Sequence, residues 1–167
     1  MSTRLHKKNM PGNLRIAVVS VSTTRKLAED VSGAWIKKQA KKEKHEVVIH
    51  QTVTDDIAAI TELTCHITEK ICPDIVIMSG GTGISPMDVT IEAVKPLFKK
   101  ELTAFGPLFT QLSFEQIDSA AILSRATAGI INQSIVFCIP GSLNACKLAC
   151  NNLIFPEMGH LLKHIKE

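Results

Sequence analysis

The sequence predicts an α/β fold in which helices cover both faces of a mainly parallel sheet. Apolar runs rich in β-branched residues alternate with segments whose apolar residues recur at helical spacing. That order implies right-handed crossovers between parallel strands. The chain has 167 residues, of which 45% are hydrophobic and 21% are charged, a balance typical of one globular domain. We expect this domain at residues 14–167, after a flexible basic N-terminal arm at residues 1–13.

The first half of the chain alternates strand and helix. Strands are expected at residues 14–21 and 46–53, which are apolar runs rich in Val and Ile. An amphipathic helix follows each of them, at 30–44 with a lysine-rich side and at 55–71 with isoleucines at helical spacing. A third apolar run predicts a strand at 74–79.

The second half is expected to form two short helices, a fourth buried strand and two closing helices, at residues 90–98, 105–117, 134–139, 142–155 and 156–167. Ser113 and Gln116 have the spacing of a helix capping box. Cys146 and Cys150 lie four residues apart among Ala and Leu, so buried thiols are expected there.

Composition argues against several other classes of protein. The five cysteines form no CxxC pair and their number is odd, which disfavours a disulfide framework or a zinc knuckle. No apolar run approaches the roughly 18 residues of a membrane span, so a reduced, cytoplasmic protein without a membrane partner is expected. The net charge of +3 is concentrated near the start and at 37–45, but aromatic residues are only 4%. A solvated helix face is favoured over nucleic-acid binding.

Polar loops follow each predicted parallel strand. Ligands bind beyond the carboxyl ends of the strands in open parallel sheets, so these four loops should share one binding rim. Their sequences are SVSTTRK, TDD, SGGTGISPMD and PGSLN.

The third loop combines glycines with hydroxyl side chains. Gly80, Gly81 and Gly83 permit positive φ angles and a close ligand, and exposed N–H groups in such a turn can bind an anion. Thr82 and Ser85 add hydroxyl donors. The loop matches neither the Walker motif nor the GxGxxG fingerprint, so the pattern alone leaves an anion site and a structural turn both open.

Two aspartates lie on the same predicted rim. Asp55 and Asp88 each precede a predicted helix, where aspartate most often serves as an N-cap. An anion-binding loop would repel both carboxylates unless a cation stood between them. Mg²⁺ bound by one or two carboxylates and by substrate phosphates would resolve that conflict.

Other polar residues of the rim have two interpretations. Arg125 could clamp a phosphate, with Ser124 as a donor, but a salt bridge is the favoured role. Ser142 is expected to cap the helix after PGS. His160 and His164 lack a third ligand at zinc-site spacing, so they are interpreted as part of a solvated terminal helix.

Four separated stretches, SGGTGISPMDVTIEAVKPLF, ELTAFGPLF, LSRATAGIIN and FCIPGSLNACKLA, closely resemble the molybdenum cofactor biosynthesis family of MoaB and MogA proteins. The resemblance extends from about Leu14 to the last helix, and the ending PEMGHLLKH is more similar to the MoaB branch. It implies a three-layer α/β/α sandwich with a mostly parallel sheet, assembled as a homotrimer or hexamer.

The resemblance also implies a reaction. Catalytic members of the family are molybdopterin adenylyltransferases, which transfer AMP from Mg-ATP to the terminal phosphate of molybdopterin and release pyrophosphate. It implies molybdopterin and ATP as binding partners, Mg²⁺ as the cofactor, and a molybdenum-insertion enzyme as a further partner. A non-catalytic molybdopterin-binding or scaffold protein of the same fold is the alternative.

By this resemblance, Asp55 and Asp88 are the catalytic and metal-binding residues. The expected substrate-binding residues match the family's site segments: Ser22, Gly80, Gly81, Thr82, Gly83, Glu101, Ser124, Pro140, Gly141 and Ser142.

Three positions depart from the family pattern. Met87 stands where the family often has arginine, which would remove a phosphate contact. Thr23 stands where an acidic residue or asparagine is frequent. Leu143 replaces a common proline.

Overall fold

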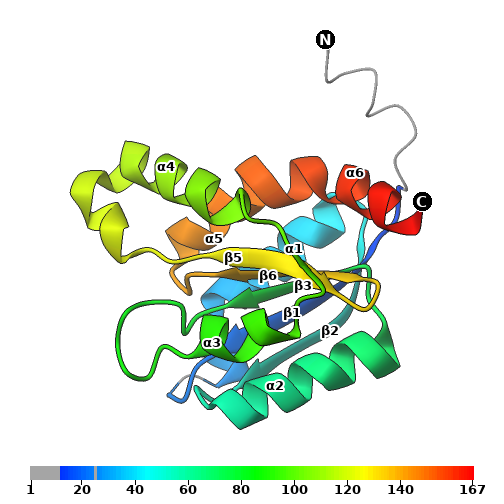
Figure 1. The fold of residues 1–167 in the computed structure, drawn as a ribbon, viewed down its shortest axis with the longest axis horizontal. Coiled ribbons are helices and arrows are strands. Elements are labelled where there is room, and N and C mark those ends of the chain that lie inside the picture. Colours follow the sequence, from blue (N-terminus) through cyan, green and yellow to red (C-terminus); the bar gives the residue numbers. More distant parts are fainter. Residues whose placement is uncertain (1–11, 25) are drawn as a thin grey trace.

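One six-stranded sheet organises the chain, and the computed structural model describes residues 12–24 and 26–167 of it (Figure 1). The expected N-terminal arm lies almost entirely outside the described residues. The strands are β1 (Arg15–Val21), β2 (Glu46–Val53), β3 (Ile75–Ser79), β4 (Lys100–Glu101), β5 (Thr127–Ile131) and β6 (Ser134–Ile139).

The helices are α1 (Val31–Lys42), α2 (Ile57–His66), α3 (Thr90–Val94), α4 (Phe105–Ile117), α5 (Leu143–Ala149) and α6 (Phe155–Lys166). Shorter helical segments are η2 (Leu27–Glu29), η3 (Ile67–Ile71), η4 (Lys95–Leu97), η5 (Asp118–Leu123) and η6 (Cys150–Ile154). Among the described residues, no helix is long and apolar enough to cross a bilayer.

The strand order is β2-β1-β3-β6-β5-β4. The first four of these strands run parallel, while β5 is antiparallel to β6 and β4 is antiparallel to β5. The expected mostly parallel sheet is therefore confirmed, but β4 and β5 were not predicted. Asn132, at φ 54°, and Gln133 form the two-residue connection between β5 and β6, and Asn-Gln is a weaker hairpin signal than Asn-Gly.

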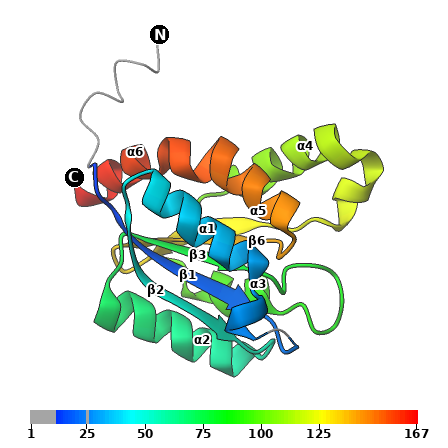
Figure 2. The same ribbon diagram turned by 180° about the vertical axis from the view of Figure 1, so that it is seen from behind.

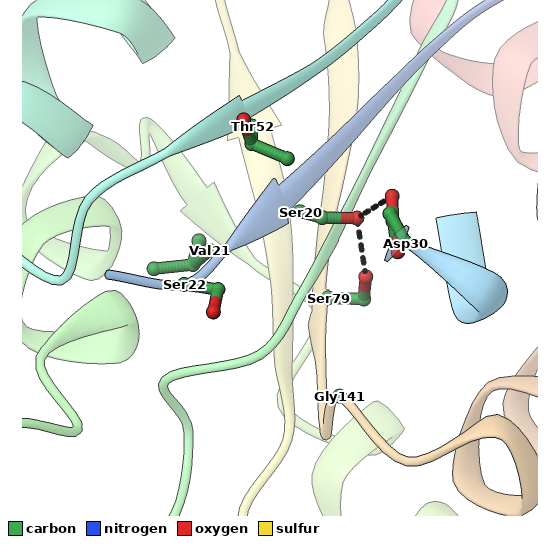
Figure 3. A pocket seen from close by; sticks show the side chains of 7 residues that line it. All are labelled: Ser20, Val21, Ser22, Asp30, Thr52, Ser79 and Gly141. Carbon is green, nitrogen blue, oxygen red and sulfur yellow. Dashed lines mark hydrogen bonds between the residues drawn. The ribbon is translucent and has the colours of Figure 1, made fainter. Parts of the chain in front are cut away.

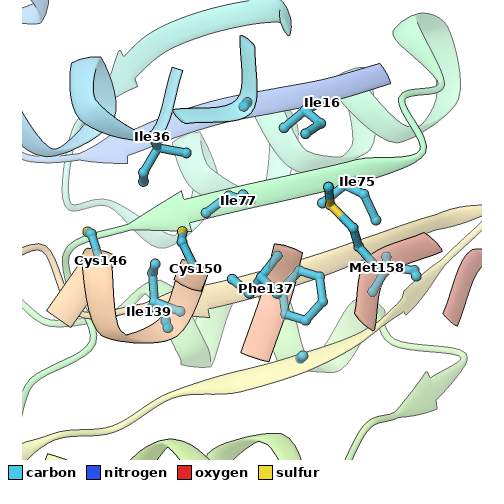
Figure 4. Close-up of a cluster of buried hydrophobic side chains, with 14 of the residues drawn as sticks. Ile16, Ile36, Ile75, Ile77, Phe137, Ile139, Cys146, Cys150 and Met158 are labelled. Atoms are coloured by element: carbon cyan, nitrogen blue, oxygen red, sulfur yellow. The ribbon is translucent and has the colours of Figure 1, made fainter. Parts of the chain in front are cut away.

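Helices cover both faces of the sheet and so make three layers (Figures 1 and 2). Alternate strand residues face opposite layers because side chains alternate along a strand. Ile16 and Val18 pack with α1, α4, α5 and α6, whereas Ala17 and Val19 pack with α2 and α3. Figure 4 shows the larger of these two cores, which belongs to the first group.

The expected helices are confirmed in place, with two differences. The C-terminal helices run on without a break, because η6 links α5 directly to α6. Ser113 is buried in the middle of α4, so the predicted capping box is wrong. The thiols of Cys146 and Cys150 are buried as expected, and burial raises the pKa of Cys150 above its usual value.

A buried carboxylate fixes the start of α1 against the end of β1. Asp30 caps α1 by accepting a hydrogen bond from the Gly33 N–H through Oδ1 at 2.8 Å. Its Oδ2 accepts one from the Ser20 hydroxyl at 2.6 Å and lies 3.0 Å from His50 Nε2. The Ser79 hydroxyl lies 3.3 Å from that of Ser20, so β1, β2, β3 and α1 meet at this cluster (Figure 3).

The Asp30 carboxylate has a shifted pKa. Burial by itself would raise this pKa, but the hydrogen bonds from Ser20, His50 and Gly33 outweigh burial and hold the pKa below its usual value. The folded state therefore prefers the ionised carboxylate more than the unfolded chain does.

We expect this preference to give a pH-dependent stability. The contribution is fully present above the unfolded-state pKa of about 3.9 and is lost as pH falls through the lower folded-state pKa. Asp30→Asn keeps the helix cap but removes the charge, so it should lower the free energy of unfolding at pH 7 by about 1–3 kcal/mol. Urea unfolding between pH 7 and pH 2 measures both effects, and the variant should lose stability less steeply with acid.

The matched control is Asp56→Asn, because Asp56 caps α2 through an exposed side chain. Its stability should stay within about 0.5 kcal/mol of wild type. Equal acid sensitivity of wild type and Asp30→Asn would show that this carboxylate is not the titrating group.

Candidate functional site

A cleft of about 550 Å³ lies at the carboxyl ends of β1, β3 and β6. This is the rim that the four polar loops predicted. Of the predicted site residues, ten line the cleft: Ser22, Asp55, Gly80, Gly81, Thr82, Gly83, Asp88, Pro140, Gly141 and Ser142. Glu101 and Ser124 do not line it.

The glycine loop is held close to the end of β1. Gly80 and Gly81 have φ angles of 104° and 62°, which favour glycine. A Cβ on Gly80 would overlap the Val21 carbonyl oxygen, and one on Gly81 would overlap the Thr90 hydroxyl. Thr90 closes the turn, because its hydroxyl donates to the Gly80 carbonyl at 2.8 Å and its N–H donates to the Gly81 carbonyl at 2.9 Å.

Asp55 is oriented by the loop that follows β1. Its Oδ2 accepts hydrogen bonds from the Thr23 N–H at 2.6 Å and the Thr23 hydroxyl at 2.8 Å. Its Oδ1 lies 3.1 Å from the place where a Cβ on Gly81 would stand. The N-cap of α2 is Asp56 instead, so the capping role considered for Asp55 is wrong. Thr23 holds the carboxylate at the cleft.

Asp88 closes the glycine loop on itself. Its Oδ2 accepts a hydrogen bond from the Ser85 N–H at 2.9 Å, and a Cβ on Gly83 would lie only 2.7 Å from that oxygen. The helix α3 begins after Val89 without a side-chain cap, so the capping role considered for Asp88 is wrong as well. In both aspartates it is carboxylate Oδ2 that accepts these hydrogen bonds.

Thr82 carries an unsatisfied hydroxyl at this cleft. The described residues have one buried side-chain oxygen or nitrogen atom that lacks a hydrogen-bond partner, and this atom is Thr82 Oγ1. The side chain is only 2% exposed although the residue lines the cleft. An unsatisfied buried hydroxyl costs about 1–3 kcal/mol, and a ligand oxygen would recover that cost.

A much smaller polar cavity lies next to the cleft. This cavity has a volume of about 10 Å³, comparable with one water molecule, and shares Val21, Ser22 and Gly141 with the cleft. Ser32, at the start of α1, donates its hydroxyl to the Gly141 carbonyl at 2.8 Å. Asp30, Ser20 and Ser79 line this small cavity (Figure 3), so the Asp30 cluster adjoins the cleft.

Arg125, between η5 and β5, supports the glycine loop through the carbonyl oxygens of the loop. Its Nε donates to the carbonyl oxygens of Thr82 at 2.9 Å and Gly83 at 3.0 Å, and its Nη2 reaches the Asp88 carbonyl at 3.4 Å. Its Nη1 pairs with Glu92 Oε1 at 2.6 Å. That hydrogen bond holds the pKa of Glu92 below its usual value. The favoured salt-bridge role is confirmed, and the guanidinium is occupied by protein groups rather than presented to a phosphate.

A second pocket of about 490 Å³ contains the two remaining predicted residues. Glu101 and Ser124 line it together with Arg125, Thr110 and other residues of α4 and β5. Glu101 pairs with Lys95 Nζ at 2.9 Å, and this contact holds the pKa of Glu101 below its usual value.

The second pocket could not be derived from the sequence. It is built on β4 and β5, which were not predicted, and its other polar lining residues include Lys95, Thr110 and Thr127. Thr127 donates its hydroxyl to Glu101 at 3.3 Å across the antiparallel pair. None of these residues stands out in the sequence, because the pairing that brings them together is not visible there.

Among the described residues, the cleft has two carboxylates, Asp55 and Asp88, as potential metal ligands. Within the described part of the chain, no group of three or more His, Cys, Asp or Glu side chains could hold a metal ion by itself. A cation at the cleft would need oxygen atoms from a ligand as well.

The sequence and the fold of this chain are both similar to those of known proteins. The sequence model of a family described as "Probable molybdopterin binding domain" matches residues 15–160. The chain belongs to this family. This confirms the resemblance found in its glycine loop and three further segments.

Molybdenum cofactor biosynthesis protein B of Bacillus subtilis is 42% identical over 168 residues, which cover 100% of this chain and 99% of that protein. The corresponding protein of Bacillus cereus is 43% identical over 162 residues, covering 96% of each.

Solved structures agree with the observed fold. A crystal structure of molybdenum cofactor biosynthesis protein B superposes with a TM-score of 0.90 at 40% identity, covering 95% of this chain and 99% of the other. The tungsten cofactor synthesizing protein MoaB of Pyrococcus furiosus gives 0.81 at 39% identity, covering 94% and 99%. The predicted three-layer MogA/MoaB-like fold is therefore confirmed.

The contacts of Arg125 generate a test. Arg125→Lys keeps the charge but loses the planar fork that serves three carbonyl oxygens and Glu92. We expect amide hydrogen exchange of residues 80–88 to become at least ten-fold faster, while exchange in β1 and β3 is unchanged. Mass spectrometry of exchanged peptides measures this.

Glu92→Gln is the matched control, because it removes only the ion pair and leaves the three carbonyl contacts. It should accelerate exchange in the loop much less than Arg125→Lys. Unchanged exchange of residues 80–88 in Arg125→Lys would contradict the supporting role of this side chain.

Proposed function

We propose that this protein is a molybdopterin adenylyltransferase that uses Mg-ATP. In the reaction, an oxygen of the terminal phosphate of molybdopterin forms a bond to the α-phosphorus of ATP. The bond from that phosphorus to the bridging oxygen breaks, and pyrophosphate leaves with the electron pair. The attacking phosphate has a second pKa of about 6, so it is already ionised at neutral pH and needs no strong base.

The observation that carries this proposal is the pairing of two carboxylates with a glycine loop in one cleft. Asp55 and Asp88 approach Gly81 and Gly83 closely. No lysine or arginine is among the described residues that line this cleft. Two anionic substrates would therefore meet a negatively charged site unless they brought a cation with them.

Mg²⁺ fits this donor set. The ion prefers carboxylate oxygens, and proteins commonly hold it by one or two carboxylates together with substrate phosphates. Asp55 and Asp88 would hold it, with Oδ2 of each oriented by the hydrogen bonds from Thr23 and Ser85. Bound Mg²⁺ would neutralise charge that develops at the phosphates. Met87 stands where the family often has arginine. In this arrangement the metal ion would supply the positive charge that the arginine would have provided.

The chain's own groups would position the phosphates. Gly80 and Gly81 let the loop pack against Val21 and Thr90 without side chains of their own, and this places the loop backbone at the cleft where a phosphate would bind. The Thr82 hydroxyl would gain the partner that it lacks. Ser142 accepts the Ala145 N–H as the cap of α5, which leaves its hydroxyl hydrogen to donate to a phosphate oxygen.

The second pocket suits the less charged end of a substrate. Its polar groups include the Ser124 and Thr110 hydroxyls, and its carboxylate, Glu101, is already paired with Lys95. A flat heterocycle with amide-like groups would match these donors and acceptors. We assign the pterin to this pocket and the ATP phosphates to the cleft. Arg125 lines the pocket while supporting the loop of the cleft.

Self-association is the second part of the proposal. The second half of α4 and η5 lie at the outer left of Figure 1. Their exposed large apolar side chains are Phe114, Ile117, Ile122 and Leu123, with exposed fractions of 56%, 49%, 84% and 53%. Such a patch marks a protein contact. We propose that it joins copies of the chain into a trimer.

An assay separates the enzyme from a non-catalytic binding protein. Wild type incubated with molybdopterin, ATP and Mg²⁺ should yield adenylylated pterin and pyrophosphate, detected by chromatography. Asp88→Asn should lower the rate at least a hundred-fold while pterin binding stays within a few-fold, because only the metal ligand is lost.

Ser85→Ala is a matched control, since it changes the same loop but keeps the Ser85 N–H that orients Asp88. It should lower the rate by no more than a few-fold. Pterin binding without product in wild type would support the scaffold alternative, and full activity in Asp88→Asn would remove the metal role of Asp88.

The apolar patch has its own test. Ile122→Lys places a charge at its most exposed position, so sedimentation velocity should show the variant shifted from trimer towards monomer. Ile57→Lys, at a residue of α2 that is 50% exposed, should leave the assembly unchanged. A trimer that survives the Ile122→Lys and Phe114→Lys substitutions together would place the interface elsewhere.

A further inference from the structure

One stripe of α6 carries four side chains with affinity for metals or protons. Glu157, His160, His164 and Glu167 are separated by three, four and three residues, which places them on one face of a helix. The sequence offered no reason to combine them, because the two histidines lacked a third ligand at zinc-site spacing. The side-chain geometry adds what the spacing could not show.

The Nε2 atoms of the two imidazoles lie close together. These atoms are 3.0 Å apart, and the ring centroids are 4.8 Å apart. The other nitrogen of each ring has a carboxylate nearby, with His160 Nδ1 at 3.5 Å from Glu157 Oε2 and His164 Nδ1 at 3.5 Å from Glu167 Oε2. Each ring therefore has a glutamate within ion-pair distance of its other nitrogen.

We propose that His160 and His164 form a binding site for a divalent transition metal ion that prefers imidazole nitrogen, such as Ni²⁺ or Cu²⁺. Metal–nitrogen bonds are about 2.1 Å long, so two nitrogens 3.0 Å apart subtend an angle of about 90° at the metal. That angle suits adjacent positions in octahedral or square-planar coordination, with water at the remaining positions.

The two glutamates would accept hydrogen bonds from the histidine ligands instead of binding the metal themselves. Histidine ligands of metals almost always donate their other ring N–H to a carboxylate or carbonyl, which fixes the tautomer and strengthens the ligand. Glu157 and Glu167 each lie within ion-pair distance of the ring Nδ1 that would donate such a bond.

Nearby lysines have partners that moderate their repulsion of a cation. Lys166 pairs with Asp74 at 3.1 Å, and Lys163 lies 3.8 Å from Glu167 Oε1. Lys99 and Lys100 line a pocket next to His164 and are the main opposing charges. The two histidine side chains are 38% and 63% exposed, so the ion can enter from solvent.

This site is separate from the cleft. The pairing of Lys166 with Asp74 anchors the end of α6 beside the start of β3, whereas the cleft lies at the opposite ends of the strands. A bound ion would fasten the last turns of α6, whose other face covers the large core through Met158 and Leu162. Because the unfolded chain does not hold the two rings together, binding should stabilise the folded protein.

Calorimetric titration of the full chain with Ni²⁺ at pH 8 tests the proposal. We expect one site per chain, with affinity at least ten-fold weaker in His160→Gln and in His164→Gln. Glu157→Gln and Glu167→Gln should each weaken binding several-fold. Ni²⁺ should also raise the melting temperature of wild type in a concentration-dependent way, and this shift should vanish in the double histidine variant.

His66→Gln is the matched control, because His66 is an exposed histidine on α2. His6→Gln, outside the described residues, is a second. Neither should change the affinity or the thermal shift. Absence of Ni²⁺ binding in wild type, or binding that survives in the double histidine variant, would overturn the proposal. The variants change solvent-exposed side chains, and circular dichroism checks that they fold.

Discussion

The close approach of the Gly80–Gly81 backbone to the end of β1 is the constraint on which the cleft depends. No side chain fits at either position, because the Val21 carbonyl and the Thr90 hydroxyl occupy the space. This approach brings the loop after β3 against the loop after β2, where Asp55 lies. Asp55 and Asp88 both line the resulting cleft, Asp55 beside Gly81 and Asp88 beside Gly83.

Several polar contacts keep that arrangement in place. Thr23 orients Asp55 from the loop after β1, and Ser85 orients Asp88 within its own loop. Arg125, in the segment between η5 and β5, supports the same loop, and the Asp30 cluster fixes the start of α1 to β1 next to the cleft. The contacts of Thr23 and Arg125 join segments more than 30 residues apart in the sequence, so loss of either should disturb the cleft more than the fold.

The sequence predicted those parts of the protein that have a strong local signal. Strand β6 and helix α2 were found because their apolar residues repeat with clear periods, and ten cleft residues followed from loop position and family motifs. Strand β5 was missed because Thr127 to Ile131 is short and contains Ala and Gly. The supporting roles of Thr23 and Arg125 were missed because tertiary contacts alone create them.

We propose that Asp55 and Asp88 together hold a divalent cation along with the phosphates of ATP. The most direct measurement is electron paramagnetic resonance of Mn²⁺, which can replace Mg²⁺ and loses its free-ion signal when bound. Wild type should bind one Mn²⁺ per chain at the cleft when ATP is present, and an Asp55→Asn, Asp88→Asn double variant should not. With the histidines of α6 replaced by Gln in both proteins, equal Mn²⁺ binding by the two would contradict the claim.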